Sequence, residues 1–121
     1  MVMPIRVTGR RLRVTFGVVA LLAISLLTLP VRAEEPMVKI DNFTFNPPML
    51  KVTVGTTVTW KNEDDIPHTV TAVNRTFKSK ALDTDDSYTF TFTTAGVYEY
   101  FCSLHPHMKA TIVVEAKTGS N

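Results

Sequence analysis

The sequence predicts an all-β domain of about seven or eight short strands, an antiparallel β-sandwich or small barrel, preceded by an N-terminal export signal. Apolar and polar residues alternate in short runs, as they do along strands that bury only one face. Turn residues, chiefly Gly, Pro and Asn, separate these runs at short intervals. Residues 34–121 show no sustained period of 3.6 residues, which an amphipathic helix would require.

The first 33 residues are expected to be a signal peptide. Four arginines lie within the first thirteen positions, before the uncharged run Val14–Leu29, which Pro30 ends. Val31-Arg32-Ala33 then offers a site for signal peptidase. A retained membrane anchor is the alternative, but a helix of that length spans only about 24 Å, short of the roughly 30 Å of a bilayer core. We therefore expect cleavage after Ala33 and export to the periplasm, with no membrane anchor left.

The remaining chain, residues 34–121, is a small acidic domain. Removal of the signal takes five arginines with it and leaves 8 basic and 11 acidic side chains, so the formal net charge changes from +2 to −3. The basic residues are not clustered, so nothing indicates nucleic-acid binding. The length suits a single domain, which we expect to be a monomer, and the one cysteine excludes an internal disulfide.

The strand-like runs continue along the whole of this domain, and only the polar stretch 75–86 leaves room for a helix. The expected strands cover residues 38–40, 43–45, 50–54, 57–60, 69–73, 88–92, 97–101 and 111–114. Large apolar side chains on these runs predict the core, namely Val54, Val58, Trp60, Phe90, Phe92, Tyr98 and Tyr100.

The loop expected after Phe101 carries the most informative chemistry. Residues 102–108, CSLHPHM, place a thiol, an imidazole and a thioether at the spacing C-x2-H-x2-M. Side chains on a loop can converge on one point, whereas neighbouring strand residues point apart. Soft sulfur ligands and imidazole suit copper, and two histidines, one cysteine and a weak axial methionine make the blue-copper arrangement. The loop supplies Cys102, His105 and Met108, and His68 is the only histidine outside it.

Each of these residues has a simpler interpretation when taken alone. A single cysteine is commonly a small buried hydrophobe or an intermolecular disulfide partner, and a methionine commonly fills a core. Their concentration in seven residues, with a histidine upstream, favours a metal site instead. Zinc is the main rival metal, but a thioether is a poor zinc ligand and zinc sites use paired Cys and His motifs. Copper is therefore predicted.

These motifs resemble those of the cupredoxins, the type 1 blue copper proteins, and the C-x2-H-x2-M loop is similar to that of the amicyanin type. The resemblance covers nearly all of residues 38–115, and its motifs occur in the family's order: Val54-Gly55, Val58–Asn62, Pro67-His68 and Gly96–Cys102. It implies a Greek-key β-sandwich with one type 1 copper ion near one end. By the same resemblance, His68, Cys102 and His105 are the equatorial ligands and Met108 is the axial ligand.

Two positions depart from the amicyanin pattern. Thr69 stands where the family usually has an asparagine that ties the two ligand loops together. A hydroxyl can also form hydrogen bonds, so we expect a working site. His107 stands where the family has phenylalanine. We expect it to point outward beside the copper, because neighbouring residues of an extended loop diverge.

Four protein ligands leave no position for a substrate, so the site implies an electron carrier and not an enzyme. The expected partners are a redox donor and a redox acceptor, such as a dehydrogenase and a c-type cytochrome. By the resemblance, the electron should leave through His105 and an apolar surface patch. The candidates for this patch are Leu104, Pro106, Met49 and Pro48. Acidic clusters at residues 63–65 and 83–86 are either solvated loops or a docking surface for a basic partner.

A copper carrier or chaperone without redox turnover is the alternative function. Such a protein would need an open site rich in Met or His, but only Met37, Met49 and Met108 remain once the signal is removed. Three histidines in total also cannot supply the additional copper centres of a multicopper oxidase or nitrite reductase.

Overall fold

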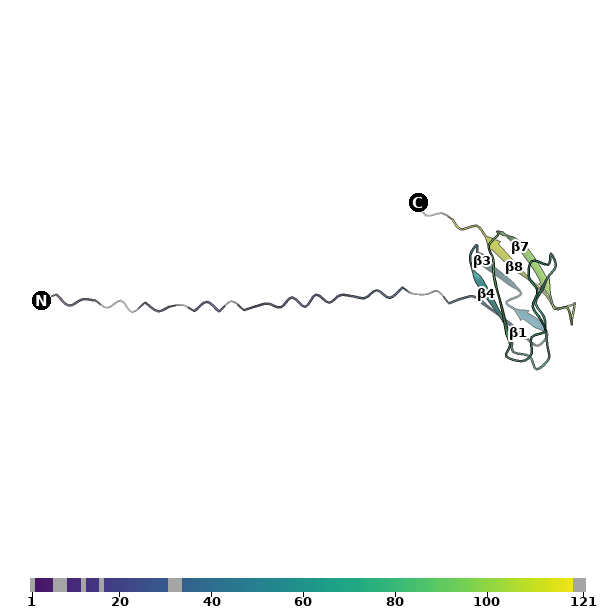
Figure 1. The fold of residues 1–121 in the computed structure, drawn as a ribbon, viewed down its shortest axis with the longest axis horizontal. Coiled ribbons are helices and arrows are strands. Elements are labelled where there is room, and N and C mark those ends of the chain that lie inside the picture. Colours follow the sequence, from purple (N-terminus) through teal and green to yellow (C-terminus); the bar gives the residue numbers. More distant parts are fainter. Residues whose placement is uncertain (1, 6–8, 12, 16, 31–33, 119–121) are drawn as a thin grey trace. The chain divides into compact units, whose positions relative to one another are not determined.

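The computed structural model describes residues 2–5, 9–11, 13–15, 17–30 and 34–118. The chain divides into two units, residues 1–31 and residues 32–121 (Figure 1). The described residues of the first unit form neither helix nor strand, and no described helix is long and apolar enough to cross a membrane. The predicted cleavage site, Val31-Arg32-Ala33, lies outside the described residues. The second unit holds all the described strands and the core.

The described part of the second unit is a sandwich of two four-stranded sheets (Figure 1). The first sheet has the order β2-β1-β4-β6 and the second β3-β8-β7-β5. From β2 to β7, each successive strand lies in the opposite sheet, so the chain repeatedly crosses between the layers. The strands are β1 Met37–Asp41, β2 Thr44–Asn46, β3 Met49–Thr53, β4 Thr57–Asn62, β5 Thr71–Ala72, β6 Ser87–Thr91, β7 Gly96–Phe101 and β8 Lys109–Glu115.

The predicted all-β sandwich is confirmed, but its sheets are mixed rather than antiparallel throughout. Strand β1 pairs with β4 in parallel, with Val38 opposite Trp60. Strand β3 pairs with β8 in parallel, with Leu50 opposite Ile112. The parallel pairs arise because the chain visits the other sheet between the two strands and returns in its original direction. Sequence alternation shows which face a strand buries, and it does not show the direction of its neighbour.

The polar stretch 75–86 contains no helix. Two isolated bridges, His68 with Leu82 and Thr71 with Lys78, fold this stretch back along residues 68–72. His68 and Leu82 exchange both backbone hydrogen bonds, at 3.1 and 2.7 Å. The strand expected at residues 69–73 is therefore reduced to β5, Thr71–Ala72. The consequence for the site is that His68 has a fixed backbone although it lies outside the regular sheets.

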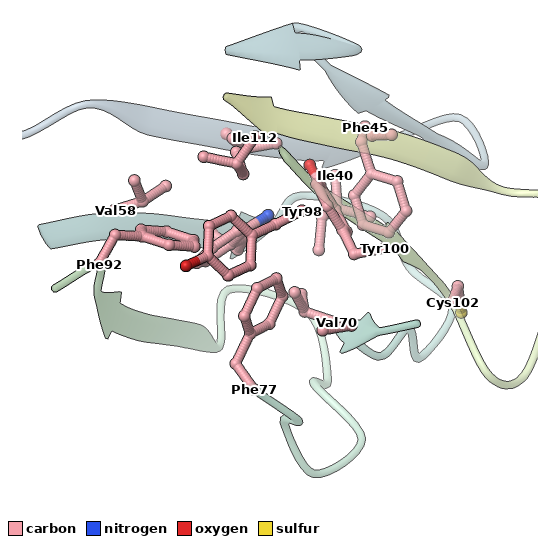
Figure 2. Close-up of a cluster of buried hydrophobic side chains, with 14 of the residues drawn as sticks. Ile40, Phe45, Val58, Val70, Phe77, Phe92, Tyr98, Tyr100, Cys102 and Ile112 are labelled. Atoms are coloured by element: carbon pink, nitrogen blue, oxygen red, sulfur yellow. The ribbon is translucent and has the colours of Figure 1, made fainter. Parts of the chain in front are cut away.

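Aromatic side chains fill the space between the sheets (Figure 2). Trp60 is completely buried, and its ring centroid lies 5.6–6.4 Å from those of four other aromatic residues, Phe77, Tyr88, Phe92 and Tyr100. All seven predicted core residues belong to this cluster, although Val54 and Phe90 are only partly buried. Cys102 lies at the edge of the cluster, away from Val58 (Figure 2), so β7 leads from the core directly to the predicted metal site.

Candidate metal centre

His68, Cys102 and His105 each bring one donor atom to a common point, as the sequence predicts. The Nδ1 atoms of both histidines lie 3.7 Å from the Sγ atom of Cys102. All three donor atoms lie within 4.8 Å of one another. His68 and Cys102 are fully buried, whereas His105 is half-buried. The cluster is therefore closed toward the protein and partly open toward solvent on the His105 side.

Backbone hydrogen bonds in the β7–β8 loop explain why the C-x2-H-x2-M spacing works. The N–H of His105 donates to the carbonyl of Cys102 at 3.2 Å, and the N–H of Met108 donates to the carbonyl of His105 at 2.9 Å. The N–H of Cys102 in turn donates to the carbonyl of Met108 at 3.1 Å. The three predicted ligand positions are thus linked by one closed set of bonds. Met108 is 3% exposed, so its side chain is buried at this end of the sandwich.

Thr69 ties the two ligand-bearing segments together, as expected of a residue that replaces asparagine. Its N–H donates to the Sγ atom of Cys102 at 3.3 Å. Its Oγ1 atom accepts the N–H of Ser103 at 2.7 Å and shares a second hydrogen bond with the Ser103 hydroxyl, also at 2.7 Å. The hydroxyl fixes the spacing between the segments.

Asp64 orients His68 from the side opposite to the thiol. The Nε2–H of His68 donates to Oδ2 of Asp64 at 2.8 Å, and the other ring nitrogen, Nδ1, faces the Sγ atom of Cys102. Burial of the carboxylate raises its pKa, but hydrogen bonds from the Phe43 N–H, His68 and the Asn42 N–H outweigh this effect. The pKa of Asp64 is consequently below its usual value, and the group is a buried anion at neutral pH.

The role of Asp64 could not be predicted from the sequence, where it is one of three consecutive acidic residues. Glu63 and Asp65 are exposed, whereas Asp64 is only 9% exposed. Asn62 is a second buried polar residue that sequence reasoning missed. Its Nδ2 donates to the carbonyls of Ile66 and Leu82 at 2.9 Å each, and its Oδ1 accepts the N–H of Asp64 at 3.0 Å. The loop that carries Asp64 and His68 is therefore rigid.

One more aromatic ring, that of Phe43, packs against the site. The ring of Phe43 lies edge-on against those of His68 and His105, with centroids 5.3 and 5.0 Å away. Phe43 was expected only as a strand residue, and nothing in the sequence pattern indicates these contacts. His107 is exposed and lies outside the cluster of donor atoms, in agreement with the expectation that it points outward.

The donor set fits a type 1 copper ion. Metal bonds of about 2.0 Å to nitrogen and 2.3 Å to sulfur, the lengths that a Zn²⁺ ion makes, opened by about 120°, separate the two donor atoms by about 3.7 Å, so the spacing suits a transition-metal ion. Both histidine nitrogens lie at that distance from the sulfur. One thiol, two imidazoles and a nearby buried thioether form the soft, closed ligand set that selects copper over magnesium or calcium.

Comparison with known proteins agrees with this assignment. Residues 34–115 match the sequence model of the copper binding proteins of the plastocyanin/azurin family. Amicyanin from Paracoccus denitrificans is 38% identical over 84 residues, which cover 65% of this chain and 64% of that protein. Among solved structures, a mutant of amicyanin with Cu(I) superposes with a TM-score of 0.65 at 35% identity, covering 71% of this chain and 87% of that one. A purple cupredoxin from Nitrosopumilus maritimus gives a TM-score of 0.63 at 34% identity, covering 66% and 99%.

Proposed function

Because the chain belongs to the plastocyanin/azurin family of copper binding proteins, we propose that it is an exported one-electron carrier with one type 1 copper ion. The observation that carries this proposal is the convergence of two Nδ1 atoms on one buried thiol sulfur, each at 3.7 Å. His68, Cys102 and His105 are the proposed equatorial ligands, and Met108 is the proposed axial ligand. The bound ion supplies a Cu(II)/Cu(I) couple.

The protein contributes rigidity and exclusion of water. His68 donates a hydrogen bond to Asp64, and Cys102 accepts one from the N–H of Thr69. Both side chains are held in fixed orientations, so the ligand set can serve both oxidation states with little rearrangement. His68, Cys102 and Met108 are buried, and with four ligands no position remains for a substrate. This arrangement favours electron transfer over catalysis. It also argues against a copper carrier, because delivery of the ion to another protein needs an accessible site.

The electron is proposed to pass through His105, the one half-buried residue of the donor cluster. The four apolar residues expected around it, Leu104, Pro106, Met49 and Pro48, are all exposed, with Leu104 at 52% and Met49 at 59%. A partner that covers Leu104 and Pro106, which flank His105 in the sequence, would come close to the imidazole. A donor such as a dehydrogenase and an acceptor such as a c-type cytochrome are the proposed partners, each in a transient complex with a monomer.

Residues 1–33 are proposed to be a cleaved signal peptide, which places the domain 34–121 in the periplasm. The family match begins at residue 34, directly after the proposed cleavage site, and this supports a boundary there. Mass spectrometry of the protein recovered from a periplasmic extract should give the mass of residues 34–121. A membrane-bound product that retains Val14–Leu29 would show that the segment is an anchor instead.

Voltammetry together with chelator challenge tests the electron-carrier function. The copper-loaded protein should show a reversible one-electron wave and should release copper slowly to a strong Cu(I) chelator. The closed site explains both results, because the ligands neither rearrange nor open. Rapid and complete loss of copper without a reversible wave would contradict electron transfer and support the carrier function.

A further inference from the structure

The turn between β1 and β2 supplies no proposed ligand, yet it meets both histidines of the site. Asp41 pairs with Thr44 across the hairpin, so Asn42 and Phe43 form a two-residue turn. Both have left-handed backbones, with φ of +49° and +57°. Such turns favour Asn followed by Gly. A phenylalanine there is an outlier that the surrounding structure must hold in place.

The carboxylate of Asp64 holds this turn. Its Oδ1 accepts the N–H of Asn42 at 3.1 Å, and its Oδ2 accepts the N–H of Phe43 at 3.0 Å. Successive backbone N–H groups in a turn form a concave site for oxygen acceptors, and the two oxygens of the buried carboxylate fit it. The same Oδ2 atom accepts the Nε2–H of His68. One side chain thus connects a proposed copper ligand to the strained turn.

The unusual backbone of Phe43 places its ring where it touches both histidines. The ring is nearly perpendicular to His68, at 86°, and to His105, at 88°. The two imidazoles have centroids 5.0 Å apart, so the three rings form one cluster. Edge-to-face contacts of this kind restrict the rotation of the rings they join. His68 is thereby fixed by both a hydrogen bond and packing, and His105 is fixed by packing.

We propose that Asp64 and Phe43 form one positioning unit for the copper ligands. Asp64 fixes His68 as the Nε2–H tautomer with Nδ1 toward Cys102, and it stabilises the left-handed turn of Phe43. Phe43 in turn sets the planes of His68 and His105. The effect on copper rests on the function proposed above, but the positioning is a property of the copper-free protein as well and can be tested there.

The first test compares Asp64→Asn with Asp65→Asn, which removes the same charge at the neighbouring exposed position. ¹⁵N NMR of the copper-free protein purified after export should show a single Nε2–H tautomer for His68 in the wild type and in Asp65→Asn. In Asp64→Asn the new amide can donate to Nε2, so the Nδ1–H tautomer should appear and Cu(II) affinity should fall about 10- to 100-fold. Equal tautomer populations and affinities in the two variants would overturn the role of Asp64.

The second test uses Phe43→Gly, which suits the left-handed backbone but has no ring. Backbone chemical shifts should show that the hairpin is retained, while the ring signals of His105 broaden and Cu(II) affinity falls. Phe43→Leu, which restores apolar volume without an aromatic edge, should not recover the affinity. Wild-type affinity and sharp His105 signals in Phe43→Gly would overturn the role of Phe43. Failure of the wild type to form a blue copper complex would instead refute the proposed function, and the tautomer measurement would still stand.

Discussion

The aromatic core around Trp60 and the metal end of the sandwich, which carries His68 and Cys102, differ in the hydrogen bonding of their buried polar atoms. Within the part of the chain that the structure describes, the indole N–H of Trp60 and the hydroxyl of Tyr100 are buried without a hydrogen-bond partner. At the metal end, the side chains of Asn62, Asp64 and His68 are each hydrogen-bonded in the interior. The core thus relies on apolar burial, which has no preferred direction, whereas the metal end relies on directional bonds. Stability and site geometry should therefore respond to different substitutions.

Removal of core volume should have the largest effect on stability and none on the copper. Ile112 is completely buried on β8 (Figure 2), so Ile112→Ala should lower the free energy of unfolding by about 2–5 kcal/mol. Urea titration of the copper-free protein measures the free energy of unfolding. Val97 is 67% exposed, so Val97→Ala serves as a control that should change this free energy by less than about 0.5 kcal/mol. The Cu(II) absorption of Ile112→Ala should match the wild type. A shifted spectrum would show that the two regions are coupled.

Loss of one hydroxyl at the metal end should affect the copper as well as stability. Thr69→Ala removes the hydroxyl that accepts the N–H of Ser103, which should cost about 0.5–1.5 kcal/mol, and it should also shift the blue band and the reduction potential. Thr91→Ala is the matched control, because it breaks the exposed hydroxyl pair with Thr57 at 2.7 Å. It should cost less than about 1 kcal/mol and leave the spectrum unchanged. An unchanged spectrum in Thr69→Ala would refute the claim that the metal end, unlike the core, controls the geometry of the copper site.

The two core tyrosines should differ in what their hydroxyls contribute. Tyr98→Phe removes a hydrogen bond to the carbonyl of Thr94 at 2.6 Å and should cost about 1 kcal/mol at neutral pH. Tyr100→Phe removes an unpartnered hydroxyl and should change stability there by less than that. Thermal or urea unfolding of the two variants at neutral pH checks this. Greater loss in Tyr100→Phe would show that its hydroxyl has a partner after all.

The hydroxyl of Tyr100 should also make the stability of the protein depend on pH in the alkaline range. Burial raises the pKa of Tyr100 above its usual value of 10.0, because the charged form of the hydroxyl would be shielded from water. The unfolded chain therefore loses this proton first, so the stability of the wild type should fall as the pH rises above about 10. Tyr100→Phe should lose less stability over the same range. Parallel curves for the two proteins would contradict a raised pKa.

The smallest expected effect is electrostatic docking through the acidic clusters. Glu63 and Asp85 lie 3.9 Å from Lys39 and Lys61, and Asp64 is buried against His68. Among the described residues, Asp65, Asp83 and Asp86 form no ion pair, so only a modest negative charge is left to attract a basic partner. Stopped-flow oxidation by a basic c-type cytochrome should therefore slow only a few-fold as salt rises, well below the roughly 10- to 1,000-fold range of strongly steered pairs. A steep dependence would favour the docking role.

Sequence could predict the features that depend on residue type and period. Alternation identified the buried faces around Trp60 and Tyr100, and the spacing of Cys102, His105 and Met108 predicted a metal site. What it missed depends on contacts between distant segments. Asp64 accepts hydrogen bonds from a turn that lies more than twenty residues away in the sequence. Nothing in the local sequence distinguishes it from its acidic neighbours. Mixed strand direction was missed for the same reason, because period-2 alternation is identical in parallel and antiparallel strands.

Absorption spectroscopy of residues 34–121 loaded with Cu(II) tests the central claim most directly, since the claim is that one thiolate and two imidazoles share a single copper ion. The wild type should show an intense blue thiolate-to-copper band. The Cys102→Ala variant, once circular dichroism has shown that it is folded, should bind Cu(II) without that band. A colourless wild-type complex, or a blue band that survives in Cys102→Ala, would contradict the account.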